Sequence, residues 1–334
     1  MKQLIQRLTE VTGPSGYESA VRDLVRAEIE GLADDIRVDA LGNLIARKGQ
    51  KGAGGVRLML SAHMDEIGLA VTHIDERGFV RFTAIGGVRP HTCIGGRVRF
   101  MNGARGLIFM ERPEAPDRLP GLDGLYIDVG ATSREDCPVR VGDIGAFERP
   151  FLEVGSRLVS KAMDDRVSVA VLIETLRQVQ AYSGPNELYF VFSTQEEVGL
   201  RGATTAAYGV DPEVGLSVDV TGTGDTPRGA RMAVALGKGP AIKVRDGGML
   251  SDPRVVRWME RVAEERGIPY QLEVLEGGTT DARAIQLTRA GVPVGCLSIP
   301  TRYIHSPSEM VDIQDVEQSV ALLAALVTSK VELD

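Results

Sequence analysis

Cysteine is scarce in this chain, and tryptophan is rarer still. The 334 residues include three cysteines and one tryptophan. Cys93, Cys137 and Cys296 are odd in number and far apart, so they show neither a disulfide framework nor the paired spacing of a thiolate zinc site. We therefore expect reduced thiols that serve as small packing residues.

Long apolar runs and clusters of basic residues are also missing. The stretch Val320–Val327 is far shorter than the ~20 residues that a membrane-spanning helix needs. The net charge is −8, with Lys and Arg scattered among acids, which argues against nucleic acid as a partner. The first ten residues mix charged and apolar groups and lack the unbroken apolar stretch of a secretory signal. These absences predict a cytoplasmic protein that spans no membrane.

The order of the expected elements predicts an α/β fold with an insertion. The apolar run Val56–Ala62 is typical of a strand covered on both faces. After residue 157, helical segments alternate with apolar strands, which predicts a doubly wound, largely parallel sheet. Between 71 and 156, short segments of alternating polarity are interrupted by Gly, Pro and Asn. We expect a catalytic domain over 1–70 and 157–334, with a small β-barrel-like domain inserted over 71–156.

Acids and histidines follow the apolar strands of the predicted sheet. His63, Glu196-Glu197, Asp219 and His305 lie at or just beyond the ends of four strands, and Asp164 precedes a predicted helix. Ligands bind beyond the carboxyl ends of strands in open α/β sheets, so we expect these side chains to converge. The chain has only four histidines, and two of them lie in these loops beside carboxylates. This combination indicates a metal site.

Charge repulsion suggests a role for each acid. Adjacent carboxylates such as Glu196 and Glu197 repel each other when buried, and a bound cation relieves that repulsion. Glu197 can then be a metal ligand, while Glu196 stays free to act as a general base toward water. Asp65 can accept the second N–H of the His63 imidazole and so fix its ring. Asp164 is the candidate for a carboxylate shared between two ions.

The set of candidate ligands predicts the number and type of the ions. Asp164, Glu197 and Asp219, together with one hydroxide, balance the charge of two divalent cations when the histidines are neutral. Nitrogen and oxygen ligands without thiolates suit Zn²⁺, Co²⁺ or Mn²⁺, and Zn²⁺ is our first expectation. Two such ions support hydrolysis of a peptide bond without a covalent intermediate.

With these residues identified, the chain resembles the glutamyl and deblocking aminopeptidase family of dinuclear metallopeptidases, which includes the tetrahedral aminopeptidases. The resemblance runs nearly end to end. It rests on GPSGYE at 13, DALGNLIA at 39, SAHMDEIG at 61, KAMDDR at 161, STQEEVGLRGA at 193, VDVT at 218, GGTTDARAI at 277 and IPTRYIHSPSE at 299.

The resemblance implies a metal-dependent aminopeptidase that removes N-terminal residues from short peptides. It implies that Glu196 is the general base and that Asp65 orients His63. The implied ligands are His63 and Asp219 for one metal, Glu197 and His305 for the other, and Asp164 as the bridge. It also implies that the inserted domain drives assembly into a homo-oligomer, commonly a hollow dodecamer. Arg283 departs from the family, which often has a small residue there, near the substrate pocket.

Other reactions fit part of this pattern. A dinuclear carboxypeptidase or deacylase uses the same kinds of ligand, and an arginine can anchor a C-terminal carboxylate. The arginines near the motifs are Arg166, Arg201, Arg283 and Arg302. A glycoside hydrolase needs no metal and would pair Glu196 with a second carboxylate, but it leaves His63 and His305 without a role. Aromatic residues, which would stack on sugars, make up only 5% of the chain.

Overall fold

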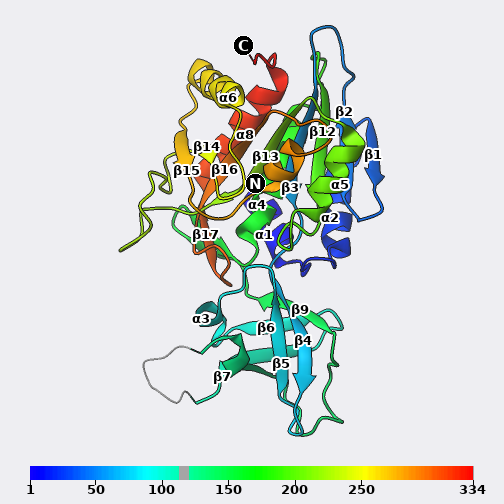
Figure 1. The fold of residues 1–334 in the computed structure, drawn as a ribbon, viewed down its shortest axis with the longest axis vertical. Coiled ribbons are helices and arrows are strands. Elements are labelled where there is room, and N and C mark those ends of the chain that lie inside the picture. The colour runs from blue at the N-terminus through cyan, green and yellow to red at the C-terminus, as the bar shows by residue number, and fades with distance from the viewer. Residues whose placement is uncertain (113–119, 334) are drawn as a thin grey trace.

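A computed structural model of the chain describes residues 1–112 and 120–333, which form an α/β body and a β barrel at one end of the long axis (Figure 1). Within these residues, eleven strands form one sheet and six strands close the barrel. None of the helices described there is both long enough and apolar enough to cross a membrane.

Four parallel strands form the centre of the sheet. Their order is β12 (Glu187–Ser193), β3 (Arg57–His63), β13 (Val214–Thr221) and β16 (Val294–Arg302). Further strands extend the sheet on both sides. Beside β12 lie β2 (Leu44–Lys48) and β1 (Asp35–Val38), and beside β16 lie β17 (Glu309–Asp312), β11 (Arg157–Ser160) and β10 (Leu152–Val154), each antiparallel to its neighbour. A branch also starts at β16, where β14 (Ala241–Arg245) pairs antiparallel with β16 and parallel with β15 (Gln271–Val274). The predicted α/β fold with a largely parallel central sheet is confirmed.

Helices cover both faces of the central strands. The helices on the larger core are α1 (Lys2–Glu10), α2 (Ser19–Ile29), α4 (Met163–Gln178), α6 (Pro253–Arg266) and α8 (Ile313–Thr328), and those on the other face are α5 (Arg201–Val210) and α7 (Asp281–Gln286). Helix α8 begins where the Asp312 carboxylate accepts the Gln314 N–H, which satisfies one free donor of the first turn.

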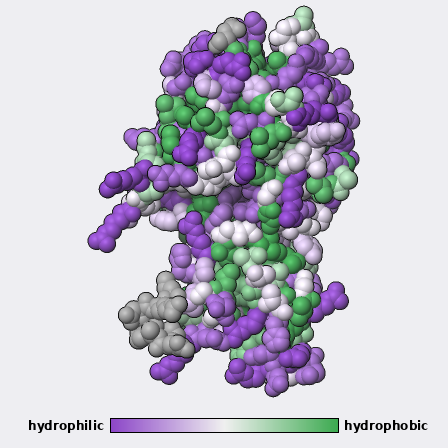
Figure 2. All heavy atoms as spheres, in the orientation of Figure 1, coloured by the Kyte–Doolittle hydropathy of each residue, from purple (hydrophilic) through white to green (hydrophobic). Residues whose placement is uncertain are grey.

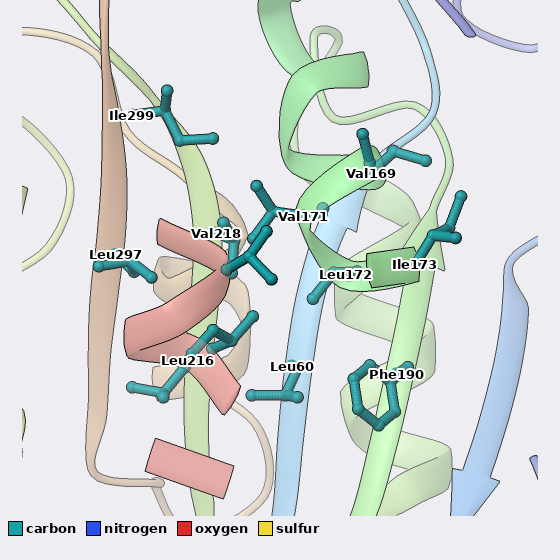
Figure 3. Packing of buried hydrophobic residues seen from close by; sticks show 14 of the residues in the cluster. Leu60, Val169, Val171, Leu172, Ile173, Phe190, Leu216, Val218, Leu297 and Ile299 are labelled. Carbon is teal, nitrogen blue, oxygen red and sulfur yellow. The ribbon is translucent and has the colours of Figure 1, made fainter. Parts of the chain in front are cut away.

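The apolar runs in the sequence arise because both faces of the strands are buried. Successive side chains of a strand point to opposite faces, so Leu60 packs in the core of α4 while its neighbour Met59 packs in the core of α5 and α7. Figure 3 shows the larger core, with Leu60, Leu216 and Leu297 coming from three neighbouring strands and Leu172 from α4. Burial on both faces requires near-continuous apolar sequence.

The barrel has a hydrophobic core of its own. Its strands, in spatial order, are β4 (Gly68–Ile74), β5 (Val80–Ile85), β8 (Leu125–Asp128), β7 (Arg105–Met110), β6 (Arg97–Phe100) and β9 (Ile144–Glu148). In β6, Val98 and Phe100 are buried while Arg97 and Arg99, which alternate with them, are exposed, as the alternation predicts. The strands run from residue 68 to residue 148, and the predicted domain boundaries at 71 and 156 stay predictions.

Candidate metal centre

The ends of the parallel strands bring the predicted residues to one pocket of about 680 Å³. Strand β3 ends at His63, β12 ends three residues before Glu196, and β16 ends three residues before His305. The predicted ligands and the predicted general base all line this pocket: His63, Asp164, Glu196, Glu197, Asp219 and His305. Asp65 is fully buried beneath them.

The Asp164 carboxylate lies between the two histidines. Its Oδ1 is 3.0 Å from His63 Nε2, and its Oδ2 is 3.3 Å from His305 Nε2. The same His305 nitrogen lies 3.2 Å from Glu197 Oε1. One carboxylate therefore faces two imidazoles through different oxygens, which is the arrangement needed to join two cation sites.

Two sets of three potential ligands share His63. One contains His63, Asp164 and Glu197, and the other contains His63, Asp165 and Asp219, with the ligand atoms of each set within 4.8 Å of one another. Asp165 was not among the predicted ligands, so its place in the second set was missed. The pair of adjacent acids in KAMDDR was the available signal. Asp165 Oδ2 also accepts the His63 backbone N–H at 3.2 Å.

Asp65 contacts both His63 and the turn that carries Glu196 and Glu197. His63 Nδ1 lies 3.1 Å from the Asp65 carbonyl and 3.4 Å from its Oδ1. The Asp65 carboxylate also accepts the backbone N–H groups of Glu196 at 2.9 Å and Glu197 at 3.2 Å, and the Ser15 hydroxyl at 2.6 Å. One buried carboxylate thus fixes an imidazole and the turn that carries the two glutamates.

Two further acids, whose roles were not predicted, position the loops. Glu309 accepts the backbone N–H of Asp164 at 2.9 Å and that of His305 at 2.8 Å. Asp281 accepts the hydroxyls of Ser61 at 2.6 Å and Ser193 at 2.5 Å, and so ties together the ends of β3 and β12. Glu309 lies in the motif that carries His305, but its partners depend on the folded arrangement.

The barrel also reaches the centre. The loop after β5 lies so close that a Cβ on Gly87 would be 2.2 Å from His305 Nδ1, and one on Gly86 would be 2.9 Å from Glu197 Oε2. These contacts leave no room for a side chain. The glycines therefore allow the barrel backbone to approach two of the predicted ligands.

The electrostatics of the pocket favour a cation. Burial, together with neighbouring carboxylates, raises the pKa of both Glu196 and Asp219 well above the ordinary range. Burial opposes a charged His305, but the negative Asp164 and Glu197 outweigh it and raise the pKa of His305 to about 11. Among residues 1–112 and 120–333, none donates a well-aligned hydrogen bond to the buried Asp165 Oδ1 or Glu197 Oε1, although His305 Nε2 lies 3.2 Å from the second of these oxygens. Divalent ions relieve the repulsion and satisfy these oxygens, so the residues fit a metal centre.

The four arginines near the motifs have different environments. Arg166 is buried and donates to the backbone carbonyls of Met64, Leu8 and Gly13. Arg302 pairs with Asp225, and Arg201 donates to Gln195. Of these four, Arg283 is the one that lines the pocket.

Comparison with known proteins identifies the family. The model of the M42 glutamyl aminopeptidases matches residues 42–322, which is most of the chain. The chain belongs to this family. The predicted family, and with it the predicted metal-dependent aminopeptidase, is therefore confirmed. The carboxypeptidase and glycoside hydrolase alternatives are not favoured.

Similar proteins match nearly the whole chain. A lysyl aminopeptidase of Pyrococcus furiosus is 38% identical, covering 99% of this chain and 98% of the relative. The structure of the aminopeptidase APDkam598 from Desulfurococcus kamchatkensis is 42% identical with a TM-score of 0.93, covering 98% and 94%. The Pyrococcus horikoshii TET1 peptidase, which can assemble into a tetrahedron or a large octahedral shell, is 33% identical with a TM-score of 0.87, covering 97% and 98%.

Proposed function

We propose that this chain hydrolyses the first peptide bond of short peptides at a centre of two divalent ions, in which Asp164 is the shared ligand. The observation that carries the proposal is the placement of the two Asp164 oxygens against two different histidines. The proposed ligands are His63, Asp164, Glu197, Asp219 and His305. Nitrogen and oxygen donors suit Zn²⁺ first, and Co²⁺ or Mn²⁺ as alternatives.

The residues around the ions have distinct proposed roles. Bound divalent ions supply Lewis acidity, which polarises the scissile carbonyl and makes water easier to deprotonate. Glu196 lines the pocket and its Oε2 lies 4.0 Å from His63 Nε2, close enough to take a proton from water in the centre. As a general base, Glu196 would take a proton from the water and later pass it to the leaving amine. Asp65 holds the Glu196 backbone and the His63 ring in position.

Release of amino acids from a panel of short peptides tests the proposed activity. We expect unblocked peptides to lose their N-terminal residue, N-acetylated copies to resist, and chelation to abolish release until Zn²⁺, Co²⁺ or Mn²⁺ is restored. The metal that restores the highest rate is the candidate for the native ion. Release from the C-terminus, or cleavage that survives complete metal removal, contradicts the proposal.

Substitution of Gly87 tests the contact between the barrel and the centre. We expect Gly87→Ala to push the His305 ring aside, because the new Cβ would meet its nitrogen at 2.2 Å. The expected result is roughly 10- to 100-fold weaker binding of one ion, the usual effect of disturbing groups that orient a ligand. Calorimetric titration of the metal-depleted protein measures this affinity.

A second glycine of the barrel gives a matched control. A Cβ on Gly106 would meet Ile127 Cγ2 at 2.4 Å, which disturbs the barrel core and no predicted ligand. Gly106→Ala should therefore lower the melting temperature and leave metal affinity unchanged. Equal metal affinities in the Gly87→Ala and wild-type proteins would show that the close approach of Gly87 does not position the His305 ring.

We also propose that the barrel joins copies of the chain into a homo-oligomer, with a dodecamer as the expected form. The barrel carries exposed apolar side chains, including Met101, Leu107 and Phe109. On the face shown in Figure 2, hydrophobic side chains gather on the part of the barrel next to the α/β body. Exposed apolar surface of this kind is typical of protein interfaces. A monomeric mass by light scattering would contradict this proposal.

A further inference from the structure

Arg283 brings a positive charge to the wall of the pocket that contains the metal centre. It is the third residue of α7, and its side chain is exposed. Among residues 1–112 and 120–333, its guanidinium has no hydrogen-bond or ion-pair partner. Gly248 lies against the side-chain stem, where a Cβ would be 2.9 Å from Arg283 Cδ. The stem is therefore supported while the charged end stays available.

The pocket residues outside the metal centre do not neutralise the charge of Arg283. Apart from the residues of the metal centre, the pocket is lined mainly by apolar side chains and hydroxyls, among them Leu200, Thr204, Leu275, Thr279, Leu287 and Thr288. Lys243 also lines the pocket, but it is buried and its Nζ lies 2.9 Å from Glu273 Oε1. The Lys243 charge is thus paired within the protein, whereas that of Arg283 is not.

We propose that Arg283 binds a carboxylate of the peptide and is a specificity-determining residue of the aminopeptidase proposed above, on which this inference rests. A guanidinium binds a carboxylate through two parallel hydrogen bonds, and these strengthen where a substrate displaces water. The carboxylate has two sources, the side chain of an N-terminal Asp or Glu and the C-terminus of a short peptide. The same charge disfavours an N-terminal Lys or Arg by repulsion.

Membership of the family does not determine which N-terminal residue this chain prefers. The family model is described by glutamyl specificity, and the Pyrococcus furiosus relative is described as a lysyl aminopeptidase. These two specificities require opposite charges in the pocket. The preference is therefore expected to depend on each member's own pocket residues. In this chain, Arg283 is a cation of the pocket lining that pairs with no acid among residues 1–112 and 120–333.

Steady-state kinetics with two sets of substrates separate the two sources. The first set contains neutral arylamides of Glu, Gln, Leu and Lys, which have no C-terminal carboxylate. The second contains tripeptides that begin with Leu and end in either a free carboxylate or an amide. The proteins are the metal-loaded wild type, Arg283→Gln and Arg283→Lys, with Arg26→Gln as the control because Arg26 is an exposed arginine of α2 outside the pocket.

We expect Arg283→Gln to lower kcat/KM about ten- to a hundredfold for one class of carboxylate substrate, mainly through KM, and to leave the Leu arylamide unchanged. A selective loss on the Glu arylamide assigns the carboxylate to the N-terminal side chain. A selective loss on the free tripeptide assigns it to the C-terminus. Arg283→Lys should retain part of the preference because it keeps the charge and loses the two-pronged geometry.

The inference is overturned if Arg283→Gln changes all substrates equally or changes none of them, while the wild type still cleaves normally. Failure of the proposed function looks different, because the metal-loaded wild type would then release no N-terminal residue from any substrate. Arg26→Gln should match the wild type throughout. A loss of preference in that control as well would show that the effect does not belong to the pocket, which also overturns the inference.

Discussion

Replacing Glu196 by glutamine is expected to lower kcat by about a hundredfold or more while both metal ions remain bound. Removal of a general base typically costs 10²- to 10⁴-fold, because the proton of the attacking water no longer has an acceptor. Glutamine keeps the size of the side chain and cannot take up the proton. The backbone N–H of residue 196 still donates to Asp65, so the turn should keep its position.

The adjacent position provides the control for this variant. Glu197→Gln removes a proposed ligand that faces His305 Nε2 at 3.2 Å, so it should lose metal as well as activity. Metal analysis beside steady-state kinetics distinguishes the two variants. Normal turnover in Glu196→Gln, or loss of metal equal to that of Glu197→Gln, would remove Glu196 from its role as general base.

The second large effect is expected from Asp164→Asn, which should abolish binding of both ions. The Asp164 carboxylate faces His63 with one oxygen and His305 with the other, so its replacement affects both sides of the centre. An amide supplies one neutral oxygen where the proposal needs two negatively charged ones. The loss of affinity should exceed the roughly 10- to 100-fold cost of removing a group that only orients a ligand.

Asp315→Asn is the matched control for Asp164→Asn. Asp315 is also buried, but it accepts the backbone N–H groups of Gly237 and Gly239. This variant should lower the melting temperature and keep its metal, because it touches no proposed ligand. If Asp164→Asn loses one ion and keeps the other at wild-type affinity, Asp164 is not shared.

The centre of the fold was predictable because its physical requirements appear in the sequence. A strand buried on both faces must be apolar along its length, as Val56–Ala62 is. Parallel strands place their carboxyl ends at one edge, which brought His63, Asp219 and His305 together. The antiparallel edge beyond β16 was also predictable in principle. Only residues 303–308 connect β16 to β17, whereas a parallel crossover needs about a dozen or more.

The supporting hydrogen bonds were not predictable in the same way. Glu309 receives a hydrogen bond from Asp164, 145 residues away, and Asp281 receives one from Ser61, 220 residues away. Such pairs depend on the exact approach of distant loops, and no spacing along the chain encodes them. The contact of Gly87 with His305 is of the same kind, because it depends on how the barrel meets the sheet.

X-ray diffraction at the absorption edge of the bound metal tests the central claim most directly. We predict two anomalous peaks about 3.5 to 4 Å apart in crystals of the wild type, one on each side of the Asp164 carboxylate. Crystals of Asp164→Asn prepared in the same way should show neither peak. A single peak in the wild type, or two peaks away from Asp164, would contradict the shared-carboxylate centre proposed for this enzyme.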